Sequence, residues 1–156
     1  MSQTKAKERA IAGGVAGVVA GLVFAVLSMA YGAVVGPNVW APLRMMATIL
    51  GFEMAPTFAA APVLVGVGLH MMLSAVYGAV FGVIVGTAGR AVVLAAGAAF
   101  GLALYVVNFH VFAQLKQFAV FQMMAGNWFE IAVHVLFGVL LAAGYVWWRG
   151  EQSLEA

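Results

Sequence analysis

Four long apolar stretches, separated by short segments that contain polar residues, proline or glycine, dominate the hydrophobic pattern of the chain. They cover residues 11–35, 63–85, 91–112 and 127–148. Each is slightly longer than the ~20 residues that an α-helix needs to cross the hydrocarbon core of a bilayer. The pattern therefore predicts a single all-α domain, an integral membrane protein with four antiparallel transmembrane helices.

Two of the three connections are long enough to hold a helix of their own. Gly36-Pro37-Asn38 ends the first stretch, and Pro42 is suited to the first turn of a short helix that ends near Gly51. Residues 114–126 form an amphipathic segment between the third and fourth stretches. We expect short interfacial helices in both loops, the first with Arg44 reaching to water. A packed surface loop is the alternative for the first.

Small residues recur every fourth position in the apolar stretches, which places them on one face of each helix. Such faces allow two helix backbones to approach closely in lipid. These faces are Gly13, Gly17 and Gly21; Gly66, His70, Ser74, Gly78, Gly82 and Gly86; and Gly97 and Gly101. We expect all of these glycines except Gly66 to hold the bundle together in its cytoplasmic half or near the midplane.

Composition agrees with a membrane protein, because 65% of the residues are hydrophobic and only 8% are charged, against roughly 25% charged in soluble domains. The sequence contains no Cys and no Asp, which excludes disulfides, thiolate metal sites and aspartate-dependent phosphoryl transfer. The net charge of +2 is too small to suggest a nucleic-acid partner. No soluble type of catalytic constellation is present, so we expect no catalytic activity of the chain's own.

The positive charges are unequally divided between the two ends of the predicted helices. Two of them, Arg44 and Lys116, fall on one side of the predicted bundle. The others fall on the opposite side: Lys5, Lys7, Arg9, Arg90 and Arg149. Because cytoplasmic loops carry an excess of Lys and Arg, this distribution places both termini in the cytoplasm.

All three histidines fall in the outer half of the predicted bundle, and Glu130 lies one helical turn from His134. Ionisable groups within a span usually face protein or water. We therefore expect His70, His110, His134 and Glu130, with Asn108, to share a polar pocket above glycine-lined helix contacts. We also expect the side chains of Glu130 and His134 to hydrogen-bond.

Three uses of this pocket remain open. The histidines could be structural, satisfied by Asn108, Ser74 or backbone carbonyls. They could form a cofactor or metal site, with His70 and His134 as axial ligands of haem b, or with His70, His110, His134 and Glu130 around copper. They could also line a path for protons or a small solute.

Three segments carry a resemblance to known proteins. They are residues 36–45 (GPNVWAPLRM), residues 104–109 (LYVVNF) and residues 127–138, which include Asn127-Trp128, His134 and Phe137-Gly138. These segments resemble a family of small bacterial four-span membrane proteins. Some members carry the label sodium:proline-symporter-like. The resemblance implies a location in the bacterial inner membrane and a four-helix fold, and it carries over no catalytic residue.

The small size and the glycine-rich faces favour a chain that works with partners. We expect an accessory or assembly subunit of a larger membrane complex, in contact with lipid and with other membrane subunits or further copies of itself. The alternative is a small oligomeric channel or carrier for protons or a small solute.

Overall fold

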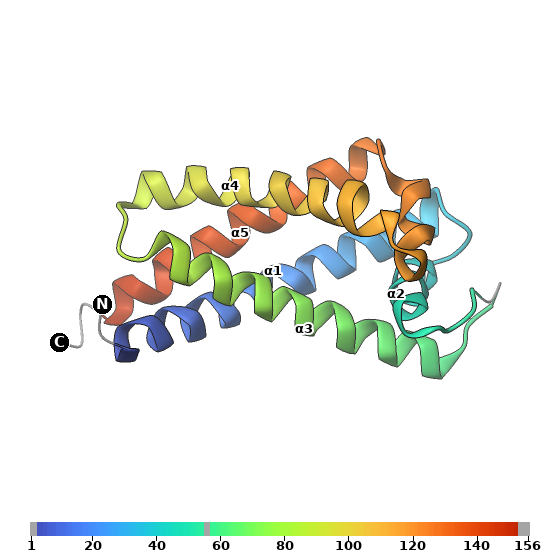
Figure 1. Cartoon of the computed structure of the whole chain (residues 1–156), viewed down its shortest axis with the longest axis horizontal. Coiled ribbons are helices and arrows are strands. Elements are labelled where there is room, and N and C mark those ends of the chain that lie inside the picture. Colours follow the sequence, from blue (N-terminus) through green and yellow to red (C-terminus); the bar gives the residue numbers. More distant parts are fainter. Residues whose placement is uncertain (1–2, 55–56, 153–156) are drawn as a thin grey trace.

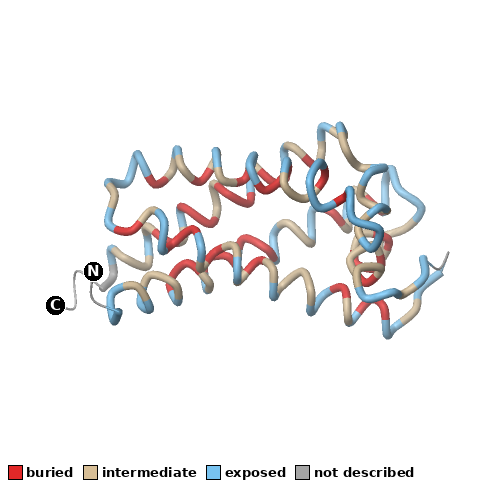
Figure 2. Tube along the Cα trace, in the orientation of Figure 1, coloured by how far each residue is buried: buried red, intermediate tan, exposed pale blue. Residues whose placement is uncertain are grey.

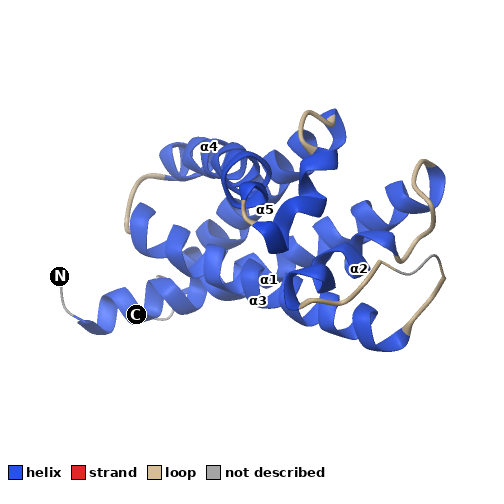
Figure 3. Ribbon diagram, turned by 45° about the vertical axis from the view of Figure 1, so that its right-hand side comes forward, coloured by secondary structure: helices blue, strands red, loops and turns tan. Residues whose placement is uncertain are grey.

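The computed structural model describes residues 3–54 and 57–152. This part of the chain is helical and contains no strand, so the all-α prediction is confirmed (Figure 3). A π-helical turn, η2, directly follows α4. The elements in order are α1 (Gln3–Val34), α2 (Ala41–Ala47), η1 (Thr48–Leu50), α3 (Ala60–Val85), α4 (Arg90–Val106), η2 (Val107–Val111), η3 (Phe112–Gln114), η4 (Lys116–Met124) and α5 (Trp128–Gln152).

Four helical segments are long and apolar enough to cross a membrane, which confirms the predicted number. They are Gln3–Val34, Ala60–Val85, Arg90–Gln114 and Trp128–Gly150. The first begins eight positions before the predicted start at Ile11, because the polar residues ahead of the apolar stretch are good helix formers and extend the helix without interruption.

The four long helices form two closely packed pairs, α1 with α3 and α4 with α5, and α5 also packs on α1 (Figure 1). The small-residue faces meet inside these pairs. A Cβ added at Gly78 would collide with the carbonyl oxygen of Gly13, and one added at Gly97 would collide with the carbonyl oxygen of Gly138. The glycines therefore permit backbone-to-backbone contact, as the four-residue spacing predicts.

Each long helix has one buried face and one exposed face (Figure 2). The faces turned toward neighbouring helices are buried, whereas large apolar side chains cover the outward faces. Exposed apolar surface of this extent is suited to contact with lipid acyl chains. Examples on the outward faces are Val19, Leu22 and Val26 of α1, Val76, Val80 and Ile84 of α3, and Val92 and Leu102 of α4.

At the end of the bundle that holds both described chain ends, called here the termini end, α5 secures the end of α3. The hydroxyl of Tyr145 donates to the carbonyl oxygens of Gly82 (3.0 Å) and Gly86 (2.9 Å). Arg149 donates to the carbonyl oxygens of Gly86 (3.1 Å) and Ala88 (3.2 Å). The Gly82 carbonyl also accepts from the Gly86 N–H, so these bonds fix the turn after α3 against α5.

At the opposite end, α2 is packed into the protein. The Leu43 carbonyl lies so close to Gly66 of α3 that a Cβ there would collide with it. Arg44 is only 1% exposed, and its guanidinium donates to the carbonyl oxygen of Thr57 and to Oδ1 of Asn38 (3.5 Å). The prediction that Arg44 reaches water is therefore wrong, because a backbone carbonyl and an amide supply its hydrogen-bond partners inside the protein.

Candidate functional site

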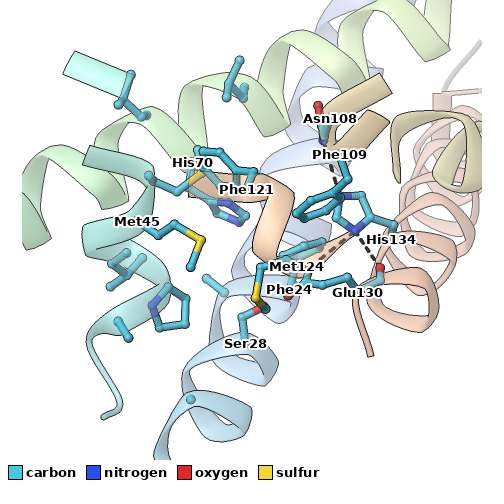
Figure 4. A pocket seen from close by; sticks show the side chains of 18 of the residues that line it. Phe24, Ser28, Met45, His70, Asn108, Phe109, Phe121, Met124, Glu130 and His134 are labelled. Atoms are coloured by element: carbon cyan, nitrogen blue, oxygen red, sulfur yellow. Dashed lines mark hydrogen bonds and ion pairs between the residues drawn. The ribbon is translucent and has the colours of Figure 1, made fainter. Parts of the chain in front are cut away.

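A cavity of about 680 Å³ lies at this second end, called here the cavity end. Its wall is built from the carboxy-terminal half of α1, from α2 and η1, the middle of α3, the α4–η2 junction, η4 and the first half of α5 (Figure 4). The two loop segments, α2 and η4, thus form part of the cavity wall. Below the cavity, toward the termini end, the glycine contacts bring the helices together.

Most of the wall is aromatic or aliphatic, which differs from the polar pocket expected from the sequence. Four methionines also contribute: Met45, Met46, Met72 and Met124. The aromatic side chains are Phe24, Tyr31, Tyr77, Phe109, Phe112, Phe118, Phe121 and Phe137. The polar ones include Ser28, His70, Ser74, Asn108, Asn127, Glu130 and His134. The cavity is therefore an apolar space with a small number of polar groups on its wall, the usual composition of a small-molecule site.

His70 joins α3 to α1. Its Nε2 lies 2.9 Å from the Gly21 carbonyl oxygen, so this nitrogen carries the proton and donates. The hydroxyl of Ser74 donates to the main-chain carbonyl of His70 (2.7 Å) and lies against Gly21. His70 and Ser74 are therefore part of the α1–α3 contact.

His134 lies in a chain of hydrogen bonds that joins α3, η2 and α5. Its Nδ1 donates to the main-chain carbonyl of Glu130 (2.7 Å), which leaves Nε2 as an acceptor. Nδ2 of Asn108 faces this Nε2 at 3.4 Å, and the hydroxyl of Tyr77 donates to Oδ1 of Asn108 (3.0 Å). One of the three interpretations of the histidines was that they are structural. It predicted hydrogen bonds to Asn108 and to backbone carbonyls, as found for His134.

The π-helical turn η2 shapes this part of the wall. Phe109 is buried, and both Asn108 and Phe109 line the cavity although they are adjacent in sequence. Single π-helical turns of this kind occur often at functional sites. The hydrophobic pattern of the third stretch contains no signal for the turn, because it continues the apolar run of α4 without a break.

His110 is the one predicted site residue that the structure places outside the cavity. It is exposed, does not line the cavity, and its ring contacts Tyr105 with 5.5 Å between centroids. The prediction that all three imidazoles share one pocket is wrong for this residue, because η2 turns Asn108 and Phe109 inward and His110 outward. Within residues 3–54 and 57–150, no three His or Glu side chains are grouped closely enough to hold a metal ion.

Phe24 of α1 lies against both remaining imidazoles. Its ring centroid is 5.2 Å from that of His70 and 4.9 Å from that of His134 (Figure 4). Each imidazole also has its Nε2 in a hydrogen bond. A haem with His70 and His134 as axial ligands needs both a free nitrogen on each ring and space between the rings. The arrangement does not fit such a haem, and sequence analysis missed Phe24 because phenylalanine is common in apolar spans.

Glu130 brings a carboxyl group into this apolar environment. It is 8% exposed, and its Oε2 lies 3.9 Å from Nδ1 of His134, beyond hydrogen-bond distance. The expected hydrogen bond between these two side chains is therefore not formed, because the His134 ring bonds to the main-chain carbonyl of Glu130 instead. In the described part of the chain, no hydrogen bond satisfies the Glu130 carboxyl group.

Replacing Asn108 by leucine is expected to lower the free energy of unfolding by about 1–3 kcal/mol, because the Tyr77 hydroxyl and Nε2 of His134 both lose their partner. Unfolding titrations in mixed micelles measure this. The matched control is His110→Leu in the same π-helical turn, which is expected to change stability by less than about 0.5 kcal/mol because His110 is exposed. Equal effects of the two substitutions would contradict the hydrogen-bond chain.

The site therefore offers an aromatic and methionine-rich space, two hydrogen-bonded imidazoles and one carboxyl group. A buried hydroxyl, that of Ser28, lies on the same wall and has no hydrogen-bond partner among the described residues. These groups are suited to holding a small molecule. No protein family, curated protein or solved structure matches the chain.

Proposed function

We propose that this chain is a membrane protein that binds an apolar small molecule with one polar end, which enters its cavity from the lipid. The observation that carries the proposal is the cavity of about 680 Å³ with an almost entirely apolar wall. Ligand sites usually measure about 300–1,000 Å³ and place a few polar groups in an apolar lining. The cavity has both properties.

The rim of the cavity supports entry from the bilayer. Met72 of α3 is 54% exposed and Phe112 of η3 is 39% exposed, yet both also line the cavity. Val35, directly after α1, and Leu50 of η1 are likewise exposed at the surface and line the cavity. Side chains that line the cavity and also reach the outer surface form an apolar entrance. An apolar molecule dissolved among acyl chains can pass such a rim without crossing water.

The proposal includes a location and an orientation. We place the four long helices across the bacterial inner membrane in alternating directions, with both termini in the cytoplasm and the cavity toward the periplasm. The positive-inside distribution supports this, because Arg44 and Lys116 are the only Lys or Arg residues assigned to the cavity end. The resemblance to small bacterial four-span proteins also supports it. In this orientation α2 and η4 lie near the periplasmic interface.

Binding within the chain itself is better supported than an accessory role or a channel. The expectation of a partner subunit depended on the small size and on glycine-rich faces, but these glycines contact one another between α1 and α3 and between α4 and α5. A path across the bundle would have to pass the same contacts. The cavity ends above them, at Ser74, Tyr77 and Phe137.

Photolabelling with a dodecanol that carries a diazirine tests the proposal. With protein in lipid nanodiscs, we expect saturable labelling of peptides from 24–37 and 69–77, and protection of these peptides by excess unlabelled dodecanol. Labelling that is confined to outward positions such as Val19 and Ile84, and that never saturates, would contradict a binding site.

A further inference from the structure

The described part of the cavity wall contains an acidic side chain but no Lys or Arg. Glu130 is the single acidic side chain among the described residues that line the cavity. The buried guanidinium of Arg44 is not part of this wall, and it donates to Thr57 and Asn38. The wall can therefore present a negative charge to a ligand, from Glu130, and no positive charge from a described Lys or Arg.

The carboxyl group of Glu130 has unused capacity for a ligand. Among the described residues, its one ion-pair contact is with Nδ1 of His134 at 3.9 Å, and that nitrogen already donates to a main-chain carbonyl. A carboxylate in apolar surroundings is costly unless a counter-charge accompanies it. The described residues supply none at this position, so a cation from outside would be the missing partner.

The aromatic side chains add a second attraction for a cation. The faces of aromatic rings carry partial negative charge, and they attract ammonium and guanidinium groups, most strongly where water is excluded. Phe24 and Phe109 both contact the His134 ring, and Phe121 of η4 contacts Phe109 on the same wall (Figure 4). Rings from α1, η2 and η4 thus line the same cavity as Glu130.

We infer that the ligand's polar end is positively charged, so that the cavity takes a lipophilic organic cation, such as a quaternary ammonium, a phosphonium or a protonated amine, with Glu130 as counter-charge. This inference rests on the proposed function and specifies its ligand class. Fatty acids and other anionic amphiphiles are disfavoured, because their charge would approach the Glu130 carboxylate without a basic residue on the wall to compensate.

Competition against the dodecanol photolabel tests the inference with two ligands of similar shape, tetraphenylphosphonium and neutral triphenylmethanol. In the wild-type protein we expect tetraphenylphosphonium to block labelling at a concentration at least tenfold lower than triphenylmethanol. In Glu130→Gln, tetraphenylphosphonium is expected to lose about tenfold in potency, whereas triphenylmethanol stays within twofold. Glu130→Asp, which keeps the charge, is expected to retain most of the preference for the cation.

The outcomes separate the two proposals. If the photolabel never labels the cavity of the wild-type protein saturably, the proposed function is wrong. If it does, but tetraphenylphosphonium competes no better than triphenylmethanol, the cavity binds neutral amphiphiles and the inference is overturned. The inference is also overturned if Glu130→Gln weakens both competitors equally. Saturable labelling of Glu130→Gln by the neutral photolabel shows that this variant keeps its cavity.

Discussion

Replacing Gly78 by alanine is expected to lower the free energy of unfolding by about 1–3 kcal/mol, the usual cost of overpacking a closely packed interface. The added Cβ would collide with the carbonyl oxygen of Gly13 and lie close to Gly17, so α1 and α3 would have to move apart. His70 and Ser74 belong to the same contact, and we expect their bonds across it to weaken as well. Unfolding titrations in mixed micelles measure the change.

Gly68→Ala is the matched control for this substitution. Gly68 lies in the same helix, but no atom comes within 4 Å of the position that its Cβ would occupy. Alanine is a better helix former than glycine, so stability is expected to stay the same or to rise slightly. If both variants lose stability equally, the loss belongs to α3 itself, and the close contact of α1 with α3 does not cause it.

Replacing Ala25 by tryptophan is expected to abolish saturable labelling of the cavity by the dodecanol photolabel, with at least a tenfold loss of affinity. Ala25 of α1 lines the cavity beside Phe24, and an indole ring there would occupy the space that a ligand needs. The cavity of about 680 Å³ has room for the ring, so the variant is expected to fold. Photolabelling and an unfolding titration of the same sample separate blocked binding from lost structure.

Val26→Trp provides the comparison on the next residue of α1. Val26 is 65% exposed and does not line the cavity, so its tryptophan would extend outward into lipid. Labelling of the cavity peptides is expected to match that of the wild-type protein. If Val26→Trp removes labelling as completely as Ala25→Trp, the label is bound on the outer surface of α1, and the cavity is not its site.

The helices and their closest contacts could be predicted from the sequence because both depend on local spacing. An uninterrupted apolar run specifies a span, and glycines four apart specify a face on which backbones meet. Gly13 and Gly78, which meet each other, and Gly97, which meets Gly138 of α5, lie on the predicted faces. Which face meets which could not be derived, because several helices carry similar glycine spacing.

The cavity wall could be predicted only in part, because it depends on contacts between distant segments. His70, His134, Glu130 and Asn108 were correctly predicted to share one pocket. His110 was not, since its direction depends on a π-helical turn that leaves no mark in the hydrophobic pattern. The aromatic character of the wall comes from η4 and α1 as much as from the predicted residues, and no local pattern shows that these segments meet.

The role of the histidines also depended on tertiary contacts. The spacing of His70 and His134 is compatible with ligation of a cofactor between two helices. It does not show that Phe24 lies against both rings, or that a backbone carbonyl and Asn108 occupy their Nε2 atoms. These contacts make the imidazoles part of the helix packing and leave Glu130 as the polar group most available to a ligand.

An experimental density map of the protein in lipid nanodiscs that contain tetraphenylphosphonium tests the central claim most directly. We predict density for one bound molecule between α1, α3 and η4, with its charged centre nearer to Glu130 than to any other charged side chain and its rings against Phe24 and Phe121. A map in which η4 and the side chains of α1 fill this space, with no density for the cation, would contradict the account.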